Sequence, residues 1–199
     1  MSALVSCIIP MFNAERFVRE AVASVLAQSH RPHEIIIVDD GSTDGTMAAV
    51  AEMGNDLRCV SQPNQGPPAA RNRGLAEATG DLIAFLDADD RWHPEKLARQ
   101  AKLFGARPDV DCCLTHAQLF WSDDMGDEEE HYRRQGRIDG PGWAGSTMVI
   151  RRRAFDVVGG FDPELRHSAT VEWFARAREQ GMVVETLPEL LTYRRMHRG

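Results

Sequence analysis

The stretch Ile83-Ala84-Phe85-Leu86-Asp87-Ala88-Asp89-Asp90 decides the fold, because an apolar run passes directly into three carboxylates. The apolar residues predict a strand buried inside a sheet. In open α/β sheets, ligands bind outside the carboxyl ends of the strands, which is where these acids fall. Asp87 and Asp89 lie two positions apart, so on an extended chain they face the same way and could share one ligand.

The three carboxylates at 87–90 repel one another unless a cation compensates their charge. Oxygen ligands of this kind suit Mg²⁺ or Mn²⁺. An acidic turn that caps the next helix is the alternative, since acids also favour helix N-termini. The pattern therefore indicates either a cation site or a helix cap.

A second predicted strand, residues 34–38, ends in the same way. It is rich in β-branched residues and is followed by Asp39, Asp40 and the glycine-containing turn 41–46. Parallel strands place their carboxyl ends at one edge, so both acidic groups should meet there. A carboxylate here could accept a hydrogen bond from a base or a ribose. A tight turn with a helix cap is again the alternative.

Strands and helices alternate along the first half of the chain. Strands are expected at 4–9, where Pro10 should end the strand, and at 34–38, 57–60 and 83–86; helices are expected at 17–26, 45–53, 69–78 and from 94 onward. This alternation predicts an α/β fold with a Rossmann-like, mostly parallel central sheet flanked by helices.

The regular alternation of strands and helices ends after Pro108. We expect a longer strand at 110–120, an exposed loop through the acidic run 123–130 and residues 132–137, a strand at 145–150, helices at 152–157 and 170–180, and short strands at 183–185 and 190–193. The chain is expected to form a single domain, 1–199, with a ligand-binding half (1–108) and a smaller irregular half (109–199).

Composition narrows the function. The chain has 199 residues and a formal net charge of −7, which argues against a nucleic-acid binder. None of the four cysteines forms a CxxC pair, and three lie in apolar contexts, which favours reduced core residues and a cytoplasmic protein. No leader peptide or membrane-spanning segment is expected.

Several motifs occur together in order: Ser6–Asn13, Val38–Thr46, Ala70–Gly74, Phe85–Asp90, Gly159–Asp162 and Tyr193–His197. Together they resemble the signature of family 2 glycosyltransferases, which have the A-type glycosyltransferase fold. The resemblance covers nearly the whole chain and is weakest from Trp121 to Gly142. It implies inverting transfer of a sugar from a nucleotide-diphosphate donor, with a UDP-sugar as the expected donor, to a hydroxyl acceptor.

The resemblance also implies roles for individual residues. Pro10, Phe12 and Asn13 would lie against the nucleotide, with Phe12 where the family often has Tyr. Asp39 would bond the base and Arg71 would sit near the base or diphosphate. The remaining implied donor residues are Asp40, Asp87, which would approach the ribose or sugar, and Ala88. The implied ligands of a Mn²⁺ or Mg²⁺ cofactor are Asp89, Asp90 and His197.

The sequence departs from the family at the catalytic base. Ala169-Thr170 stands where Glu-Asp is expected, and a threonine cannot act as a base near neutral pH. Glu172 is one candidate; two residues along a helix turn it about 200° away, so it would reach the site only if the helix began later. His167 is the second candidate.

Two functions therefore remain open: an active transferase in cell-surface polysaccharide or glycolipid synthesis, and a catalytically weakened nucleotide-sugar-binding protein of the same fold. The acceptor, a saccharide or a lipid-linked saccharide, is expected to contact 121–143 and 168–173. At most peripheral contact with the inner face of the cell membrane is expected, and no nucleic-acid partner.

Overall fold

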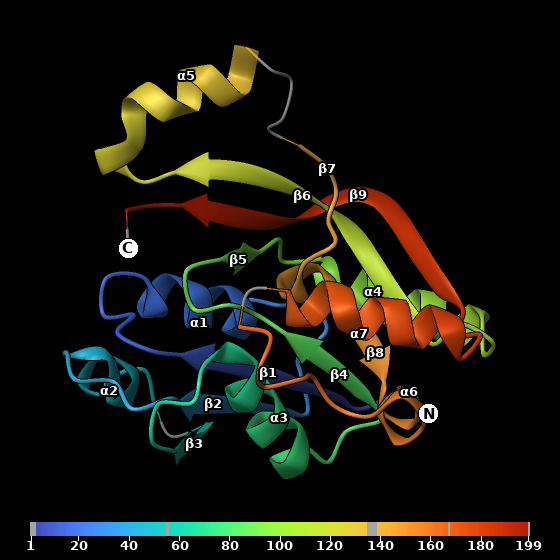
Figure 1. The fold of residues 1–199 in the computed structure, drawn as a ribbon. Helices are drawn as coiled ribbons and strands as arrows, with labels where there is room; N and C mark the ends of the chain where they lie inside the picture. Colours follow the sequence, from blue (N-terminus) through green and yellow to red (C-terminus); the bar gives the residue numbers. More distant parts are fainter. Residues whose placement is uncertain (1–2, 55, 135–138, 167, 199) are drawn as a thin grey trace.

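A sheet of nine strands runs through the part of the chain that the computed structural model describes, residues 3–54, 56–134, 139–166 and 168–198. Its first four strands are parallel, in the order β3-β2-β1-β4 (Figure 1): β1 (Val5–Met11), β2 (Glu34–Asp39), β3 (Leu57–Ser61) and β4 (Leu82–Phe85). The chain winds outward from β1 to β3 and then places β4 on the other side of β1. This reversal is the switch point at which such sheets bind ligands.

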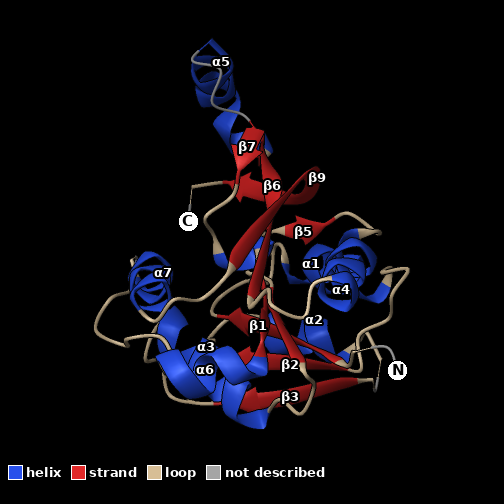
Figure 2. Cartoon of the chain, turned by 90° about the vertical axis from the view of Figure 1, so that its right-hand side faces the viewer, coloured by secondary structure: helices blue, strands red, loops and turns tan. Residues whose placement is uncertain are grey.

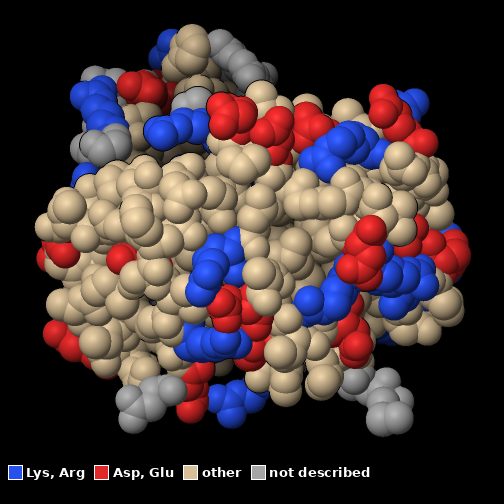
Figure 3. Space-filling view, turned by 60° about the horizontal axis from the view of Figure 1, so that its bottom comes forward, with Lys and Arg blue, Asp and Glu red and all other residues tan. Residues whose placement is uncertain are grey.

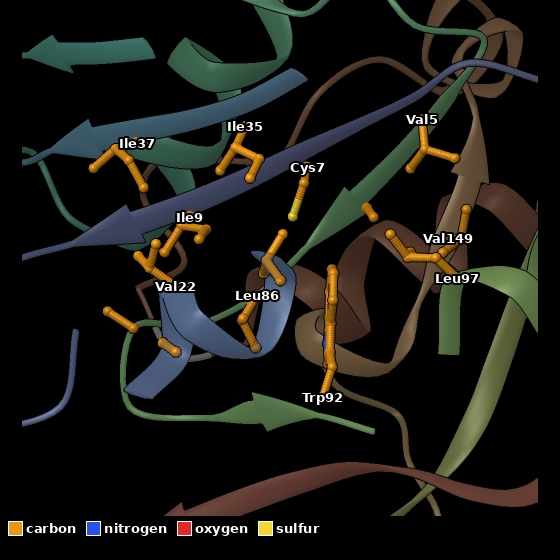
Figure 4. Packing of buried hydrophobic residues seen from close by; sticks show 14 of the residues in the cluster. Val5, Cys7, Ile9, Val22, Ile35, Ile37, Leu86, Trp92, Leu97 and Val149 are labelled. Carbon is orange, nitrogen blue, oxygen red and sulfur yellow. The ribbon is translucent and has the colours of Figure 1, made fainter. Parts of the chain in front are cut away.

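Helices cover both faces of these strands. The first face packs against α1 (Val18–Leu26), α2 (Thr46–Ala51) and α4 (Lys96–Ala106), and Figure 4 shows Ile9 of β1 beside Val22 of α1. Ile8 precedes Ile9 in sequence and points to the second face, which packs against α3 (Pro67–Glu77), α6 (Arg152–Val158) and α7 (Ala169–Glu179). Burial on both faces explains the continuous apolar runs Cys7–Met11 of β1 and Ile35–Val38 of β2.

The second half extends the same sheet. The strand β8 (Val149–Arg151) pairs antiparallel with both β4 and β6 (Cys112–Trp121). The long strand β9 (Val184–Met196) then runs parallel to β6, and Figure 2 shows the two strands rising together from the sheet. Two short strands, β5 (Arg91–Trp92) and β7 (Asp139–Pro141), pair with β9 and β6. The predicted α/β architecture is therefore confirmed.

Pro10 lies inside β1, so the prediction that it ends the strand is wrong. The backbone shows why it is tolerated. The amide of Leu86 donates to the carbonyl of Ile8, so the even-numbered residues of β1 bond toward β4. Pairing with β4 ends at Ile8, opposite Phe85. The missing N–H of Pro10 therefore faces a side where no strand partner continues.

The acidic run forms structure where an exposed loop was predicted. A short 3-10 turn, η1 (Asp123–Met125), leads into the helix α5 (Gly126–Arg134), which stands off the body in Figures 1 and 2. Ion pairs one helical turn apart, Glu129 with Arg133 and Glu130 with Arg134, favour this helix. Residues 135–137 of the predicted loop fall outside the described residues.

Two further strand predictions need correction. The region predicted as a strand at 145–150 begins as a 3-10 turn, η2 (Gly145–Thr147), and only then enters β8. The two short strands predicted near the C-terminus are one strand, β9, whose pairing with β6 shifts register between Thr115 and Ala117. Long-range pairing with β6 holds β9 together, and no local pattern reveals such pairing.

Three further observations concern the surface charge, the helices and the cysteines. On the face drawn in Figure 3, basic and acidic side chains lie in mixed clusters. Within the described residues, every helix is too short or too polar to cross a lipid bilayer. Cys7, Cys112 and Cys113 are buried and free, as their apolar contexts predicted, whereas Cys59 is exposed.

Candidate functional site

A cavity of about 480 Å³ opens at the carboxyl edge of the sheet, at the switch point between β1 and β4. It is lined by the end of β1, the start of α3, the 87–89 turn and His197, which follows β9. The lining residues are Pro10, Met11, Phe12, Asn13, Ala14, Arg16, Phe17, Asp40, Asn64, Gly66, Pro67, Ala70, Arg71, Asp87, Ala88, Asp89, Arg166 and His197.

The wall after β1 is held in place by the turn after β2. Asn13 has a positive φ of 47°, which asparagine tolerates better than most residues. Its amide donates to Ser42 Oγ at 3.0 Å, and its Oδ1 accepts from the amide of Thr43 at 2.8 Å. Phe12 precedes this turn and stays 49% exposed inside the cavity. An aromatic face is thus available on a fixed backbone.

The two acids after β2 have different roles in the structure. Asp40 accepts hydrogen bonds from Gln62 Nε2 and from the amides of Gln65 and Gly66, so its oxygens fix the 62–66 loop at the cavity rim. Asp39 is also buried, and its Oδ1 accepts from the amide of Ser42. Of this predicted pair, the structure brings Asp40 to the cavity surface and places Asp39 behind it.

Arg71 and Asp87 form an ion pair across the cavity floor. Arg71 Nη2 lies 2.5 Å from Asp87 Oδ1, and the arginine side chain is 9% exposed against 30% for the aspartate. Nε of Arg71 is buried and lacks a hydrogen-bond partner among the described residues. Arg71 and Asp87, which the sequence analysis named as site residues, are thus in contact although they lie 16 positions apart in the chain. The Nε–H of Arg71 remains available as a hydrogen-bond donor.

Asp90 turns away from the cavity, which does not fit its predicted role as a metal ligand. Its Oδ2 accepts from Ser146 Oγ at 2.6 Å and its Oδ1 from the amide of Arg195 at 2.9 Å. Burial, and then the charges of Asp89 and Asp87, raise the pKa of Asp90 from 3.8 to about 8, against these two hydrogen bonds. Asp90 thus anchors the acidic turn to η2 and β9.

Asp89 and His197 face each other at the cavity wall. Asp89 Oδ2 lies 3.1 Å from His197 Nε2, and the imidazole packs on Phe17 with ring centroids 4.6 Å apart. Arg195 fixes this pair, because its Nε donates to the carbonyl of Asp89 and its guanidinium lies between the rings of Phe17 and Phe120. β9 thereby carries the C-terminal histidine to a carboxylate 108 positions away.

This pair fits a divalent cation that shares its coordination with a ligand. One carboxylate oxygen and one imidazole nitrogen suit Mn²⁺, and diphosphate oxygens and water can fill the other positions. Within the described residues, no group of three or more His, Cys, Asp and Glu side chains forms a complete metal cage. A cation on Asp89 and His197 would therefore complete its coordination with other oxygens, such as those of a bound diphosphate and water.

Two of the three candidate catalytic residues, Thr170 and Glu172, fall on α7. The helix α7 begins at Ala169, so the condition under which Glu172 could reach the site is not met. The carboxylate of Glu172 instead forms two hydrogen bonds to Arg176, at 2.5 and 2.8 Å, which lower the pKa of Glu172. Neither Thr170 nor Glu172 lines the cavity. His167 lies outside the described residues.

Sequence reasoning did not single out several residues that line the cavity, among them Phe17 and Arg166. Phe17 supports His197 although it belongs to the start of the first helix region. Arg166 lies over Gly66, where a side-chain carbon on the glycine would sit 3.7 Å from Arg166 Cγ. No sequence signal connects residues 100 positions apart, so only the folded chain reveals this contact.

Comparison with known proteins decides the family. The sequence profile of Glycosyl transferase family 2 matches residues 6–159. The chain belongs to this family. This family 2 chain is 32% identical to an uncharacterized glycosyltransferase of Nostoc sp. over 218 residues, which cover 97% of the chain and 65% of the relative. It is also 42% identical over 108 residues to TuaG of Bacillus subtilis, a relative named for teichuronic acid biosynthesis, covering 52% of the chain and 43% of TuaG. The family 2 chain therefore spans less than two thirds of the length of either relative.

Solved structures share the fold of this family 2 chain. S. aureus TarS 1–349 in complex with UDP-GlcNAc superimposes with a TM-score of 0.79 at 22% identity, covering 98% of the chain and 59% of TarS. The mannosyltransferase PcManGT from Pyrobaculum calidifontis, in complex with GDP-Man and Mn²⁺, gives a TM-score of 0.74 at 23% identity, covering 97% of the chain and 57% of PcManGT. The A-type glycosyltransferase fold predicted from the motifs is thus confirmed.

Proposed function

We propose that this chain is the transferase unit of a metal-dependent, inverting glycosyltransferase that moves a sugar from a UDP-sugar to a hydroxyl acceptor. One observation carries the proposal: the cavity at the switch point combines an aromatic and amide wall, Phe12 and Asn13, with a carboxylate–imidazole pair, Asp89 and His197. A flat base suits the first wall and a metal-bound diphosphate suits the second. The nucleotide-sugar complexes of the two structural neighbours support this assignment.

The charges of the cavity fit the departure of a nucleoside diphosphate. The leaving group gains negative charge as the glycosidic bond breaks, and a divalent cation on Asp89 and His197 would offset that charge without proton transfer. Asp87 is held by Arg71, and this ion pair would orient its carboxylate toward the ribose or sugar of the donor. Arg16 and Arg166 also line the cavity and add positive side chains. These residues bind and orient the donor before transfer.

A base must also remove the proton of the acceptor hydroxyl, and the two described candidates are poorly suited to this step. Thr170 carries no basic group, and Glu172 is paired with Arg176. This pairing favours the second candidate function, a nucleotide-sugar-binding protein with weakened transfer. In either case we propose that 1–108 supplies most of the donor site, to which Arg166 and His197 are added, and that the rest of 109–199 meets the acceptor, within one domain. We also propose that the acceptor belongs to a cell-surface polysaccharide or glycolipid.

Release of nucleotide from a panel of donors tests the proposal. The purified chain would be incubated with Mn²⁺ and UDP-glucose, UDP-galactose, UDP-GlcNAc or GDP-mannose, and free nucleotide would be measured. We expect release from a UDP-sugar that stops with a chelator and in His197→Ala. Metal-dependent binding of a UDP-sugar without any release would establish the weakened binding protein instead. Release that is equally fast with chelator would refute the metal-dependent mechanism.

A further inference from the structure

Trp143 is a large apolar side chain that is left mostly exposed to solvent. It is 58% exposed, although tryptophan is usually well buried. It lies between β7 and η2 and packs against Phe174 of α7, with ring centroids 5.2 Å apart and ring planes at 85°. Phe174 itself is buried, so the indole rests on the core while most of its surface remains accessible.

The backbone on both sides of Trp143 is fixed. The amide of Gly142 donates to the carbonyl of Thr115, and Thr147 Oγ1 donates to the carbonyls of Gly142 at 2.6 Å and Ala144 at 2.8 Å. A side-chain carbon on Gly142 would lie 2.4 Å from Thr147 Cγ2, so the chain passes closely there. A ligand that contacts the indole would therefore meet a group that is already ordered, which lowers the entropy cost of binding.

The position of Trp143 points to the acceptor. Gly145, two residues on, lies against the guanidinium of Arg71; a side-chain carbon there would be 3.3 Å from Arg71 Nη2. The Cα atoms of Trp143 and Gly145 can be at most about 7 Å apart. The backbone that carries the indole therefore lies close to the Arg71–Asp87 ion pair of the cavity. In Figure 1 the segment after β7 descends beside α7, whose first turn carries Thr170.

The surroundings of the indole combine an apolar face with hydroxyls. Thr170 precedes Phe174 by four residues on α7, so the two side chains lie on the same side of the helix. Val171, also on the first turn, is 61% exposed. A pyranose ring presents polarised C–H bonds on one face and hydroxyls at its edge. The negative face of an indole attracts such C–H bonds, and a threonine can exchange hydrogen bonds with a sugar hydroxyl.

We propose that Trp143 is the platform on which a pyranose ring of the acceptor stacks, with Thr170 close to the edge of that sugar. This inference rests on the proposed function and deepens it, because it names a saccharide ring as the part of the acceptor that the chain recognises. It also gives Thr170 a role in binding the acceptor. Trp143 is then a residue that sets acceptor specificity, while the donor residues remain those of the cavity.

Saturation-transfer NMR tests the stacking. The probes are methyl β-D-glucoside, methyl β-D-galactoside and methyl N-acetyl-β-D-glucosaminide, each added to the chain with UDP and Mg²⁺, which unlike Mn²⁺ is diamagnetic and leaves the probe signals sharp. We expect transfer from the protein to the ring protons of at least one probe, reduced at least about fivefold in Trp143→Ala and largely retained in Trp143→Phe, since phenylalanine keeps an aromatic face. Val157→Ala, which removes an equally exposed apolar side chain on α6, should leave the transfer unchanged.

Calorimetric titration of UDP into the same samples distinguishes failure of the stacking proposal from failure of the proposed function on which it rests. Trp143→Ala should bind UDP with wild-type affinity, which also shows that the variant is folded. If no probe receives transfer from the wild type, or if Trp143→Ala transfers as much as the wild type, the stacking proposal is wrong while the donor site stands. If the wild type binds no UDP, the proposed function fails whatever the sugars do.

Discussion

Lys96 is completely buried, and its replacement by methionine should change how the stability of the fold depends on pH. Its Nζ donates to Gln100 Oε1 at 2.8 Å and lies 4.2 Å from the centroid of the Trp92 ring, and no described carboxylate pairs with it. Burial lowers the pKa of Lys96 from 10.5 to about 7. The folded state therefore carries a lysine that is close to losing its proton at neutral pH.

The sign of the effect follows from proton binding. Between the folded pKa near 7 and the unfolded value of 10.5, the unfolded chain holds a proton that the folded chain has released. Stability must then rise with pH across this window, by at most about 1.4 kcal/mol per pH unit. From pH 7 to pH 8.5 the lysine should add roughly 2 kcal/mol to the free energy of unfolding.

Neighbouring thiols do not obscure this change. Burial raises the pKa of Cys7 to about 12 and of Cys113 to about 11, and that of Cys112 also rises well above its ordinary value. All three therefore stay neutral in the folded state at pH 8.5. Thiols of the unfolded chain ionise alike in the wild type and in Lys96→Met, so their effect cancels in the comparison.

Urea unfolding at pH 7 and pH 8.5, followed by tryptophan fluorescence, measures the effect. The wild type should gain roughly 2 kcal/mol relative to Lys96→Met between the two pH values. Loss of one hydrogen bond to Gln100 destabilises the variant equally at both, so only the pH-dependent part reports on the lysine charge. An equal difference between the two proteins at both pH values would refute the reasoning.

Three further predictions concern packing, the base and the donor. Gly74→Ala should lower the free energy of unfolding by about 1–3 kcal/mol, because the new carbon would meet Ile8 Cγ2 at 2.3 Å, whereas Gly105→Ala, with nothing within 4 Å, should not; thermal unfolding compares them. Glu172→Gln should leave nucleotide release unchanged, since its carboxylate is committed to an ion pair; abolished release would restore it as the base. Arg71→Met should weaken UDP binding roughly tenfold by calorimetry, while a matched change at an exposed arginine of the same helix, R73M, should not.

The two central strands β2 and β4 could be predicted because their sequences are almost entirely apolar. Ile35–Val38 and Ile83–Leu86 are buried on both faces, so their sequences can only fit a central position. Each strand ends in aspartates, which identified the functional edge before any contact was known. The second half depends on long-range pairing of β6 with β9, which local patterns do not encode.

The different orientations of Asp87, Asp89 and Asp90 could not be predicted from the sequence. All three look alike in sequence, yet Asp87 pairs with Arg71, Asp89 faces His197 and Asp90 turns inward. Their environments differ because partners come from distant positions, such as Ser146 for Asp90. The ion pair of Glu172 with Arg176 is different, because the two residues lie one turn apart on the helix predicted at 170–180 and the pair is therefore consistent with the sequence alone.

Titration of UDP into the chain by calorimetry, with Mn²⁺ and with a chelator, tests the central claim most directly. If the cavity at the switch point holds a metal-bound diphosphate through Asp89 and His197, UDP should bind in the presence of Mn²⁺. Binding should weaken at least about tenfold with the chelator and in Asp89→Ala. No binding of UDP to the wild type, or the same affinity with and without Mn²⁺ and in Asp89→Ala, would contradict the account.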